Sequence, residues 1–263
     1  MRASVSRHFK RSGPPIVTII AVIVLWSVMI DVWKIPAYLL PTPGSVFSSL
    51  GDGLMSSSLW MHWVTTVKNW LLGYVIGTTA ALLVAILVVQ FKLVELFLLP
   101  LILALQSVPK IALAPLVFVW IGFGESSIVT MAALTSYFPT LINSLQALRN
   151  YDSDLSDLYQ SLGAGRLRFL RDVKLFSAAP QIFAGMEIGL LFGLIGTVVM
   201  EFIVASKGLG YVIQSSANSA DLPLNFGAIL LLAVSGITCS AILRFARRTI
   251  LFWENSNGRG KSV

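Results

Sequence analysis

Few residues in this chain are of types that carry out chemistry. The two histidines, His8 and His62, lie far apart without companions, so they suggest neither a metal site nor a catalytic triad. No pair of carboxylates has catalytic spacing. The one cysteine, Cys239, lies in an apolar run and is expected to be a small packing residue. We therefore predict no catalytic residue, no metal site and no cofactor in this chain, which excludes an enzyme.

Three charged residues lie inside apolar runs, where an ion is costly. Lys110 follows Pro109 near the middle of its run, and both a pathway or gating role and a buried structural pair remain open. Glu201 stands near the end of its run with Lys207 close by, which favours structural pairing or capping over substrate contact. Glu187 is expected to extend its carboxylate to water.

The composition indicates an integral membrane protein. Of the 263 residues, 56% are hydrophobic and only 12% are charged, against roughly 25% charged in a soluble domain. The mean hydropathy is +0.82, and the apolar residues come in runs long enough to cross a bilayer. The net charge of +7 does not indicate nucleic acid, because the basic residues flank apolar runs.

The apolar runs predict an all-α integral membrane protein with six transmembrane helices. They are expected near residues 14–33, 64–89, 96–121, 128–148, 180–204 and 226–245. Pro100, Pro109 and Pro115 predict that the third span is kinked or broken. Segment 46–63 is expected to be a short interfacial helix that includes Trp60 and Trp63, and 205–225 a polar loop.

The basic residues predict the orientation of these helices. Of the 19 lysines and arginines, 15 fall in the N-terminus, the turn at Lys92, the segment 149–174 and the C-terminus. An excess of basic residues marks the cytoplasmic side, so both termini are expected there. We expect one membrane domain over 14–250 with cytoplasmic tails at 1–13 and 251–263. The first apolar run is expected to be retained.

The charged segment 149–174 predicts two short helices on the cytoplasmic side. Leu155, Leu158, Tyr159 and Leu162 form one helical stripe. Ser153 or Asp154 can cap the start of this helix, Gly163 suits its end, and a second amphipathic helix is expected from Arg166 to about Lys174. The stripe needs something to bury against: this chain's own membrane domain, lipid headgroups or a partner.

Glycines four residues apart line two of the predicted spans. Gly73 and Gly77 share one face, as do Gly185, Gly189 and Gly193, with Gly196 nearby. Such spacing lets another helix approach closely. Packing within the chain, a shared pathway and a dimer seam all remain open for the second stripe.

Several motifs together resemble a known family. Asp157–Ala164 is similar to the E-A-A-x-x-x-G-A loop of bacterial ABC importer permeases. Further matches are Leu40–Pro43, Val108–Leu116, Trp120–Glu125, Phe138–Pro139, Pro180 with Gly185, Glu201–Phe202 and Lys207–Tyr211. The resemblance covers about residues 16–250 and is closest to the nitrate, sulfonate and taurine branch. The chain departs from the pattern at Asp157, Leu158 and Tyr159, which replace the glutamate and two alanines.

The resemblance implies a permease subunit of type I ABC importers, with ATP and Mg bound by a separate cytoplasmic ATPase. The loop helix would sit in a groove of that ATPase through Leu155, Asp157, Leu158, Tyr159, Leu162, Gly163 and Ala164. Candidates for the pathway or gate are Pro109, Lys110, Gly185, Gly189, Gly193 and Glu201. An external binding protein would deliver a small solute, such as nitrate, a sulfonate, taurine or a related organic compound.

The resemblance also implies a homodimer, or a pseudo-symmetric pair of permease subunits, in the bacterial inner membrane, with no nucleic-acid partner. The alternative is a secondary transporter driven by an ion gradient. That class would need internal repeats and coupling-ion sites, and the sequence contains neither. A membrane scaffold without transport is a third possibility.

Overall fold

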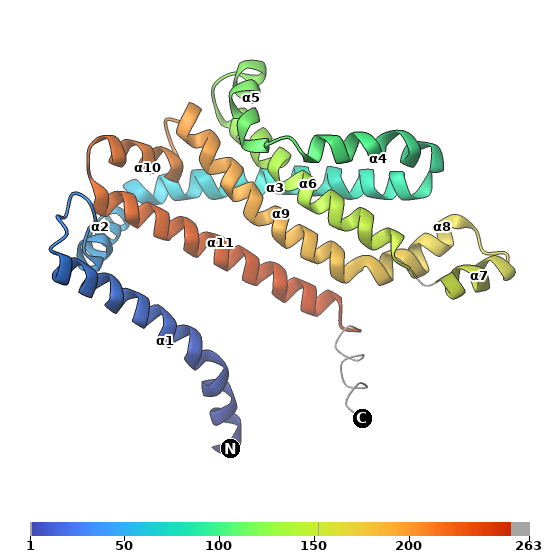
Figure 1. Cartoon of the computed structure of the whole chain (residues 1–263), viewed down its shortest axis with the longest axis horizontal. Helices are drawn as coiled ribbons and strands as arrows, with labels where there is room; N and C mark the ends of the chain where they lie inside the picture. The colour runs from blue at the N-terminus through green and yellow to red at the C-terminus, as the bar shows by residue number, and fades with distance from the viewer. Residues whose placement is uncertain (1, 152, 254–263) are drawn as a thin grey trace. The chain divides into compact units, whose positions relative to one another are not determined.

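The structure, a computed structural model, describes residues 2–151 and 153–253, and every regular element in these ranges is a helix (Figure 1). The elements are α1 (Arg2–Trp33), α2 (Pro43–Met55), α3 (Ser58–Gln90), α4 (Lys92–Gln106), the 3-10 helix η1 (Lys110–Leu113), α5 (Ala114–Ile121), α6 (Glu125–Arg149), α7 (Ser153–Ser161), α8 (Arg166–Phe169), the π-helix η2 (Leu170–Lys174), α9 (Leu175–Val204), α10 (Leu209–Asn218) and α11 (Leu222–Ile250). Most of the predicted C-terminal tail, residues 254–263, lies outside the described residues.

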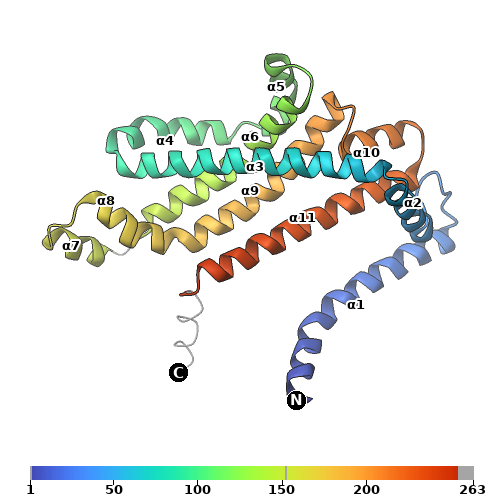
Figure 2. The same ribbon diagram turned by 180° about the vertical axis from the view of Figure 1, so that it is seen from behind.

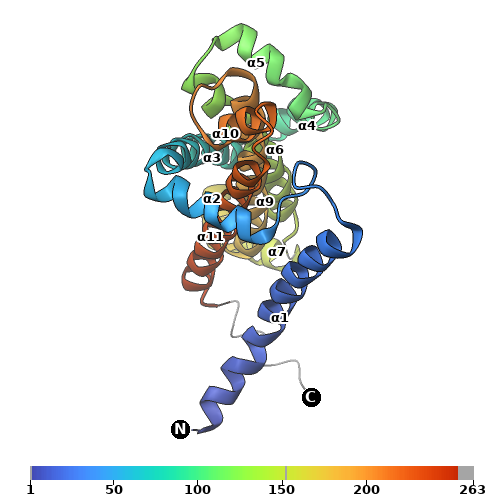
Figure 3. The ribbon, with the colours of Figure 1, turned by 90° about the vertical axis from the view of Figure 1, so that its left-hand side faces the viewer.

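Four of the described helices are long and apolar enough to cross a membrane. They are α3, α6, α11 and the continuous helix Leu167–Val204. Helices α4 and α5 meet the same test only together, and the chain bends by 91° between them; Figure 3 shows α5 turned out of the line of α4. The described apolar part of α1, Val17–Trp33, is shorter. The all-helical membrane fold is confirmed, whereas helix length alone supports four or five spans.

The break predicted in the third span lies between Gln106, where α4 ends, and Lys110, where η1 begins, and it includes the middle proline, Pro109. Pro100 is accommodated inside α4, whereas Pro109 precedes η1 and has an extended backbone. A proline disfavours the helical conformation of the residue before it and lacks a backbone N–H, so the helix ends here. The third apolar run is therefore two helices joined by a sharp bend.

The chain forms two compact units. One comprises the residues up to 61 together with 212–231. In this unit Thr42 caps α2 by accepting a hydrogen bond from the backbone N–H of Ser45, and Trp26 packs on Phe226 with 5.8 Å between ring centroids. The interfacial helix is shorter than predicted, because α2 ends at Met55. Trp60 and Trp63 belong to α3 instead.

Among the described residues, the other unit comprises 62–151, 153–211 and 232–253, and it is built around α6. Helix α9 runs along α6 in both Figure 1 and Figure 2. A Cβ at Gly185 would lie 2.5 Å from Cβ of Asn143, and one at Gly189 would lie 2.5 Å from Oγ1 of Thr140. Both distances are shorter than real Cβ contacts, so α9 can approach α6 this closely only because these positions are glycine.

The first glycine stripe packs on the same helix. A Cβ at Gly73 of α3 would lie 2.5 Å from Cβ of Ala132, and one at Gly77 would collide with the backbone of Ala133. Since small residues remove the separation that side chains impose, α6 is held closely by both α3 and α9.

Small hydroxyl residues make the faces of α6 compatible with burial. Thr135, Ser136 and Thr140 are buried, and their hydroxyls donate to carbonyls one turn earlier, at 2.8, 2.7 and 3.0 Å. Because these hydroxyls are satisfied within α6 itself, they need no partner on the neighbouring helices. The result is a rigid, closely packed group of α3, α6 and α9.

Candidate functional sites

The exposed apolar face of α7 is the first candidate site. Leu155, Leu158 and Leu162, the last just beyond the end of the helix, are 39%, 50% and 72% exposed, and Asp157 is also exposed. A helix of nine residues is marginal by itself in water. Three leucines on one exposed stripe are therefore the surface by which α7 would pack against another body.

Tyr159 differs from the other residues of the predicted stripe. It is only partly exposed and its ring packs on Phe169, with 5.5 Å between centroids. Tyr151 contacts the same ring edge-on at 5.3 Å. Tyr159 thus ties α7 to α8 within this chain, which leaves the leucines as the free part of the stripe.

Gly163 forms the turn that ends α7. Its φ is +68°, in the left-handed region that favours glycine. The backbone N–H of Ala164 donates to the carbonyl of Tyr159 at 2.9 Å, as expected for a left-handed glycine cap. The cap predicted at Gly163 is confirmed, and it fixes the direction in which the chain leaves α7.

The second helix of the loop is not a separate element. α8, the single π-turn η2 and α9 follow one another without a break, and the helix from Leu167 to Val204 has 38 residues. Leu170 and Val173 in the π-turn are buried. The prediction of an independent helix from Arg166 to Lys174 was therefore wrong, because apolar residues of the loop continue directly into the fifth span. Figure 2 shows α7 and α8 at the end of the α6 and α9 pair.

At the opposite end of α9 lies a polar cluster that we call the clasp: His62, Thr66, Glu201 and the segment 208–210. Three successive backbone N–H groups are each accepted by a different side chain. Gly208 donates to Nδ1 of His62 at 3.0 Å, Leu209 to Oγ1 of Thr66 at 2.7 Å, and Gly210 to Oε2 of Glu201 at 2.7 Å. These N–H groups lie at the start of α10, where helical donors lack backbone partners.

The carboxylate of Glu201 is the centre of the clasp. Its side chain is 1% exposed, and it accepts the Thr66 hydroxyl at 2.8 and 3.1 Å in addition to the Gly210 N–H. Gly208 and Gly210 give the carboxylate room, since a Cβ at Gly210 would lie 2.6 Å from Cβ of Glu201. These contacts provide the capping that was one of the predicted alternatives, and a role of Glu201 in a pathway stays a prediction. The partners are neutral groups, however, and no ion pair with Lys207 occurs among the described residues.

The sequence alone did not predict that His62 and Thr66 accept hydrogen bonds from the backbone at the start of α10. The Thr66 hydroxyl and Glu201 are 135 positions apart, and nothing local in the sequence marks such a contact. His62 also lies against the ring of Tyr211, 5.8 Å between centroids. The one available signal was the Glu201 position before a glycine-rich segment, which predicts that backbone N–H groups come close to the carboxylate.

Residues 205–225 were predicted to form a polar loop. This prediction is wrong for Leu209–Asn218, which form the helix α10. The helix is short and partly polar, and it follows a glycine-containing segment, so the whole stretch resembled a loop. Its start is held by the clasp. The glycine-containing segment is therefore an ordered connection between α9 and α10.

Lys110 lies at the bend between α4 and α5 instead of within a straight span. Its amino group donates to the carbonyl of Gln106 and stands over the ring of Phe138, 4.9 Å from the centroid. Such a cation–π contact replaces the buried ion pair that was one alternative. A role of Pro109 and Lys110 in a pathway stays a prediction.

The remaining predicted residues have partners within the chain. Glu187 forms an ion pair with Arg244 of α11 at 2.6 Å, so it does not extend freely to water as predicted. Gly185, Gly189 and Gly193 are buried against α6, which provides the contacts of the first alternative, packing within the chain. Their participation in a pathway also stays a prediction.

Comparison with known proteins matches residues 73–251 to the family of binding-protein-dependent transport system inner membrane components. The chain belongs to this family. It is thus an ABC importer permease, a transport component that is not itself an enzyme, and a multi-pass protein of the inner membrane. The sequence resemblance is confirmed, and the permease family accounts for both the apolar helices and the projecting loop.

Individual relatives cover nearly the whole permease. The riboflavin transport system permease protein RibX of Chloroflexus aurantiacus is 32% identical over 91% of this chain and 90% of that protein. The putative aliphatic sulfonates transport permease protein SsuC of Bacillus subtilis is 30% identical, covering 89% and 85% respectively. The taurine transport system permease protein TauC of Escherichia coli is 27% identical, covering 90% and 88%. The permease is therefore of the branch that includes sulfonate and taurine permeases.

The fold is similar to a solved permease. The inward-facing MetNI methionine ABC transporter aligns with a TM-score of 0.60 at 17% identity, over 73% of this chain and 95% of the compared chain. At this identity the similarity concerns the fold alone.

Proposed function

We propose that this permease moves a small organic anion or a related small solute across the inner membrane. Transport would be driven by an ATPase that binds α7. The observation that carries the proposal is the exposed stripe of Leu155, Leu158 and Leu162. A helix-in-groove contact uses such a stripe. The partner ATPase would hold ATP and Mg, and the outer binding protein would deliver the solute.

The continuity of the helix Leu167–Val204 supports a mechanism for this coupling. A 38-residue helix is about 57 Å long, enough to connect the loop to the far face of a bilayer. Helix α9 packs closely on α6 at its glycines. A displacement of α7 would therefore move α8, α9 and α6 together. The alternation of access would then follow from the movement of this group as one body.

We place α7 and both termini on the cytoplasmic side. The support is the distribution of lysines and arginines, 15 of 19 on that side. The clasp would then lie near the outer face. A second copy of the chain would complete the pathway as a homodimer. The named solutes of the relatives, sulfonates, taurine and riboflavin, support a small organic solute.

Co-purification with the ATP-binding subunit of the same transport system tests the proposal. The full-length chain is expected to retain that subunit, whereas Leu158→Asp should reduce the retained amount about tenfold or more, since a charge would be placed in an apolar groove. The matched control is Leu167→Asp, because Leu167 is 74% exposed on α8 and lies outside the α7 stripe. Equal retention by Leu158→Asp and the unmodified chain would contradict the proposed docking.

A further inference from the structure

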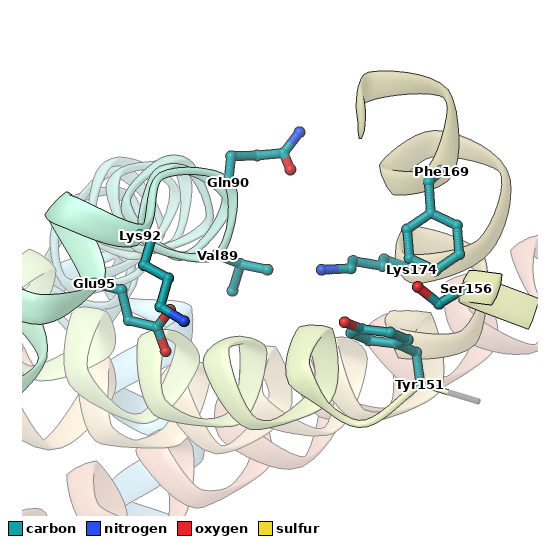
Figure 4. Close-up of a pocket in the computed structure, with 8 residues that line it drawn as sticks. All are labelled: Val89, Gln90, Lys92, Glu95, Tyr151, Ser156, Phe169 and Lys174. Atoms are coloured by element: carbon teal, nitrogen blue, oxygen red, sulfur yellow. The ribbon is translucent and has the colours of Figure 1, made fainter. Parts of the chain in front are cut away.

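A cavity of about 260 Å³ lies beside the loop, between the α3–α4 turn and the start of the long helix (Figure 4). Its lining is formed by Val89, Gln90, Lys92, Glu95, Tyr151, Ser156, Phe169 and Lys174. The α7 stripe is not part of this lining. The cavity is therefore a second feature of the same end of the molecule, with polar chemistry in place of an apolar surface.

Lys174 is the central cation of the cavity. Figure 4 shows its amino group extending into the open space, toward Val89 and Gln90. The ammonium lies 4.3 Å from the ring centroid of Tyr151 and 5.7 Å from that of Phe169. It forms no ion pair with any carboxylate in the described part of the chain. The aromatic rings thus hold a positive charge in place without neutralising it.

The other charges leave the cavity positive. Glu95 is the one acidic residue of the lining, and its carboxylate is already bound by Arg149 at 2.6 Å. Lys92 adds a second ammonium from the opposite wall. Lys92 also begins α4, whose N-cap residue Phe91 supplies no side-chain cap, so the positive end of that helix dipole adds to the field. An anion is the ligand that this charge distribution favours.

The donors suit a phosphate group. Lys92 and the amide of Gln90 belong to the α3–α4 turn, whereas Lys174 and the hydroxyl of Tyr151 lie on the opposite wall, so donors face a tetrahedral anion from two sides (Figure 4). A planar carboxylate is best matched by an arginine fork, and Arg149 is occupied by Glu95. The chemistry therefore points to phosphate.

The surroundings indicate that the phosphate belongs to a lipid. Leu93, directly after Lys92, and Phe97, one turn further along α4, are 71% and 73% exposed. A free phosphate gains nothing from such apolar neighbours, whereas acyl chains would cover them. Basic pockets between membrane helices on the cytoplasmic side are a known way to hold anionic headgroups.

We propose that this cavity binds the phosphate of an anionic phospholipid headgroup through Lys92 and Lys174. Only the statement that the lipid comes from the cytoplasmic leaflet rests on the proposed function. Binding itself depends on the cavity alone. The bound lipid would join the α3–α4 turn to the base of the long helix.

Native mass spectrometry of the full-length chain in a neutral detergent tests this inference. Phosphatidylglycerol is expected to be retained roughly 20-fold better by the unmodified chain than by the Lys92→Gln/Lys174→Gln double variant, since each basic residue contributes about fivefold. Phosphatidylcholine, which carries a compensating cation, should be retained equally by both. The single variant Lys174→Arg keeps the positive charge, so it should retain most of the phosphatidylglycerol that the unmodified chain retains. This result separates an effect of charge from misfolding.

The control is Lys68→Gln. Lys68 forms an exposed ion pair with Glu125 and lies outside the cavity, so this variant should retain phosphatidylglycerol like the unmodified chain. Equal retention of phosphatidylglycerol by the double variant would overturn the proposal. Complete displacement of the retained phosphatidylglycerol by inorganic phosphate would also overturn it, because the cavity would then recognise a free anion instead of a lipid. Loss of lipid binding with ATPase retention unchanged would leave the proposed function intact.

Discussion

The two ends of the helix Leu167–Val204 differ in how they are stabilised. At one end α7 presents leucines that are 39–72% exposed, and the Gly163 turn and the Tyr159–Phe169 contact help to position it. At the other end the clasp buries Glu201 and satisfies three consecutive backbone N–H groups with side chains. An exposed apolar end is suited to bind another body, whereas a buried polar end is suited to keep a fixed geometry. Substitutions at α7 should therefore mainly affect the binding of a partner, whereas substitutions at the clasp should mainly affect the free energy of unfolding.

The largest effect on stability is expected for Glu201→Ala. The change would leave the Gly210 N–H and the Thr66 hydroxyl without their buried acceptor, which should lower the free energy of unfolding by about 3 to 5 kcal/mol. The thermal unfolding midpoint in detergent measures this effect. The matched control is Glu187→Gln, whose partner Arg244 is about half exposed, so the loss there should be about 1 kcal/mol or less. Equal losses in the two variants would refute the special role of the clasp.

Thr66→Val should have an intermediate effect. Valine has nearly the same shape, but it can neither donate to Glu201 nor accept from the Leu209 N–H, so a loss of about 2 kcal/mol is expected. The same thermal measurement applies. Thr130→Val is a suitable control, because the Thr130 hydroxyl bonds only to the carbonyl of Ser126 one turn earlier. If Thr66→Val were as stable as the control, the clasp would contribute little to folding.

Gly163→Pro should have the smallest effect on stability and the strongest effect on coupling. Proline fixes φ near −65°, whereas Gly163 has +68°, so the turn after α7 cannot form. Membrane insertion should be unchanged, and the free energy of unfolding, followed by the thermal midpoint, should change by about 1 kcal/mol or less. Retention of the ATPase should fall about tenfold or more. Gly165→Ala is the control, because Gly165 has open space and needs no left-handed backbone. Normal ATPase retention by Gly163→Pro would show that the α7 direction is unimportant.

Much of the fold followed from local properties of the sequence. The long apolar runs predicted α3, α6, α9 and α11, because a lipid environment requires continuous apolar helices of this length. Pro109 predicted the break in the third span because a proline lacks a backbone N–H and disfavours a helical residue before it, although Pro100 is accommodated inside α4. The stripe of α7 and its cap at Gly163 were predicted from helical spacing and from the conformational freedom of glycine.

The remaining features depend on residues far apart in the chain. The contact of Glu201 with Thr66 and the ion pair of Glu187 with Arg244 join helices whose mutual position no local pattern defines. Helix α10 was missed because its ten residues follow a glycine-containing segment and include several polar residues, which together resemble a loop. The continuity of α8 with α9 was missed because a π-turn has no sequence signature of its own.

The π-turn Leu170–Lys174 also has a consequence for engineering. It accommodates one residue more than an α-helical turn, and one residue corresponds to a rotation of about 100° around the helix axis. The direction of α7 and the orientation of the α9 glycines are therefore set with respect to each other by this one additional residue. A chimera that joins the loop of one permease to the membrane helix of another must conserve the residue count between Gly163 and Gly185. Otherwise one of the two faces will turn away from its partner.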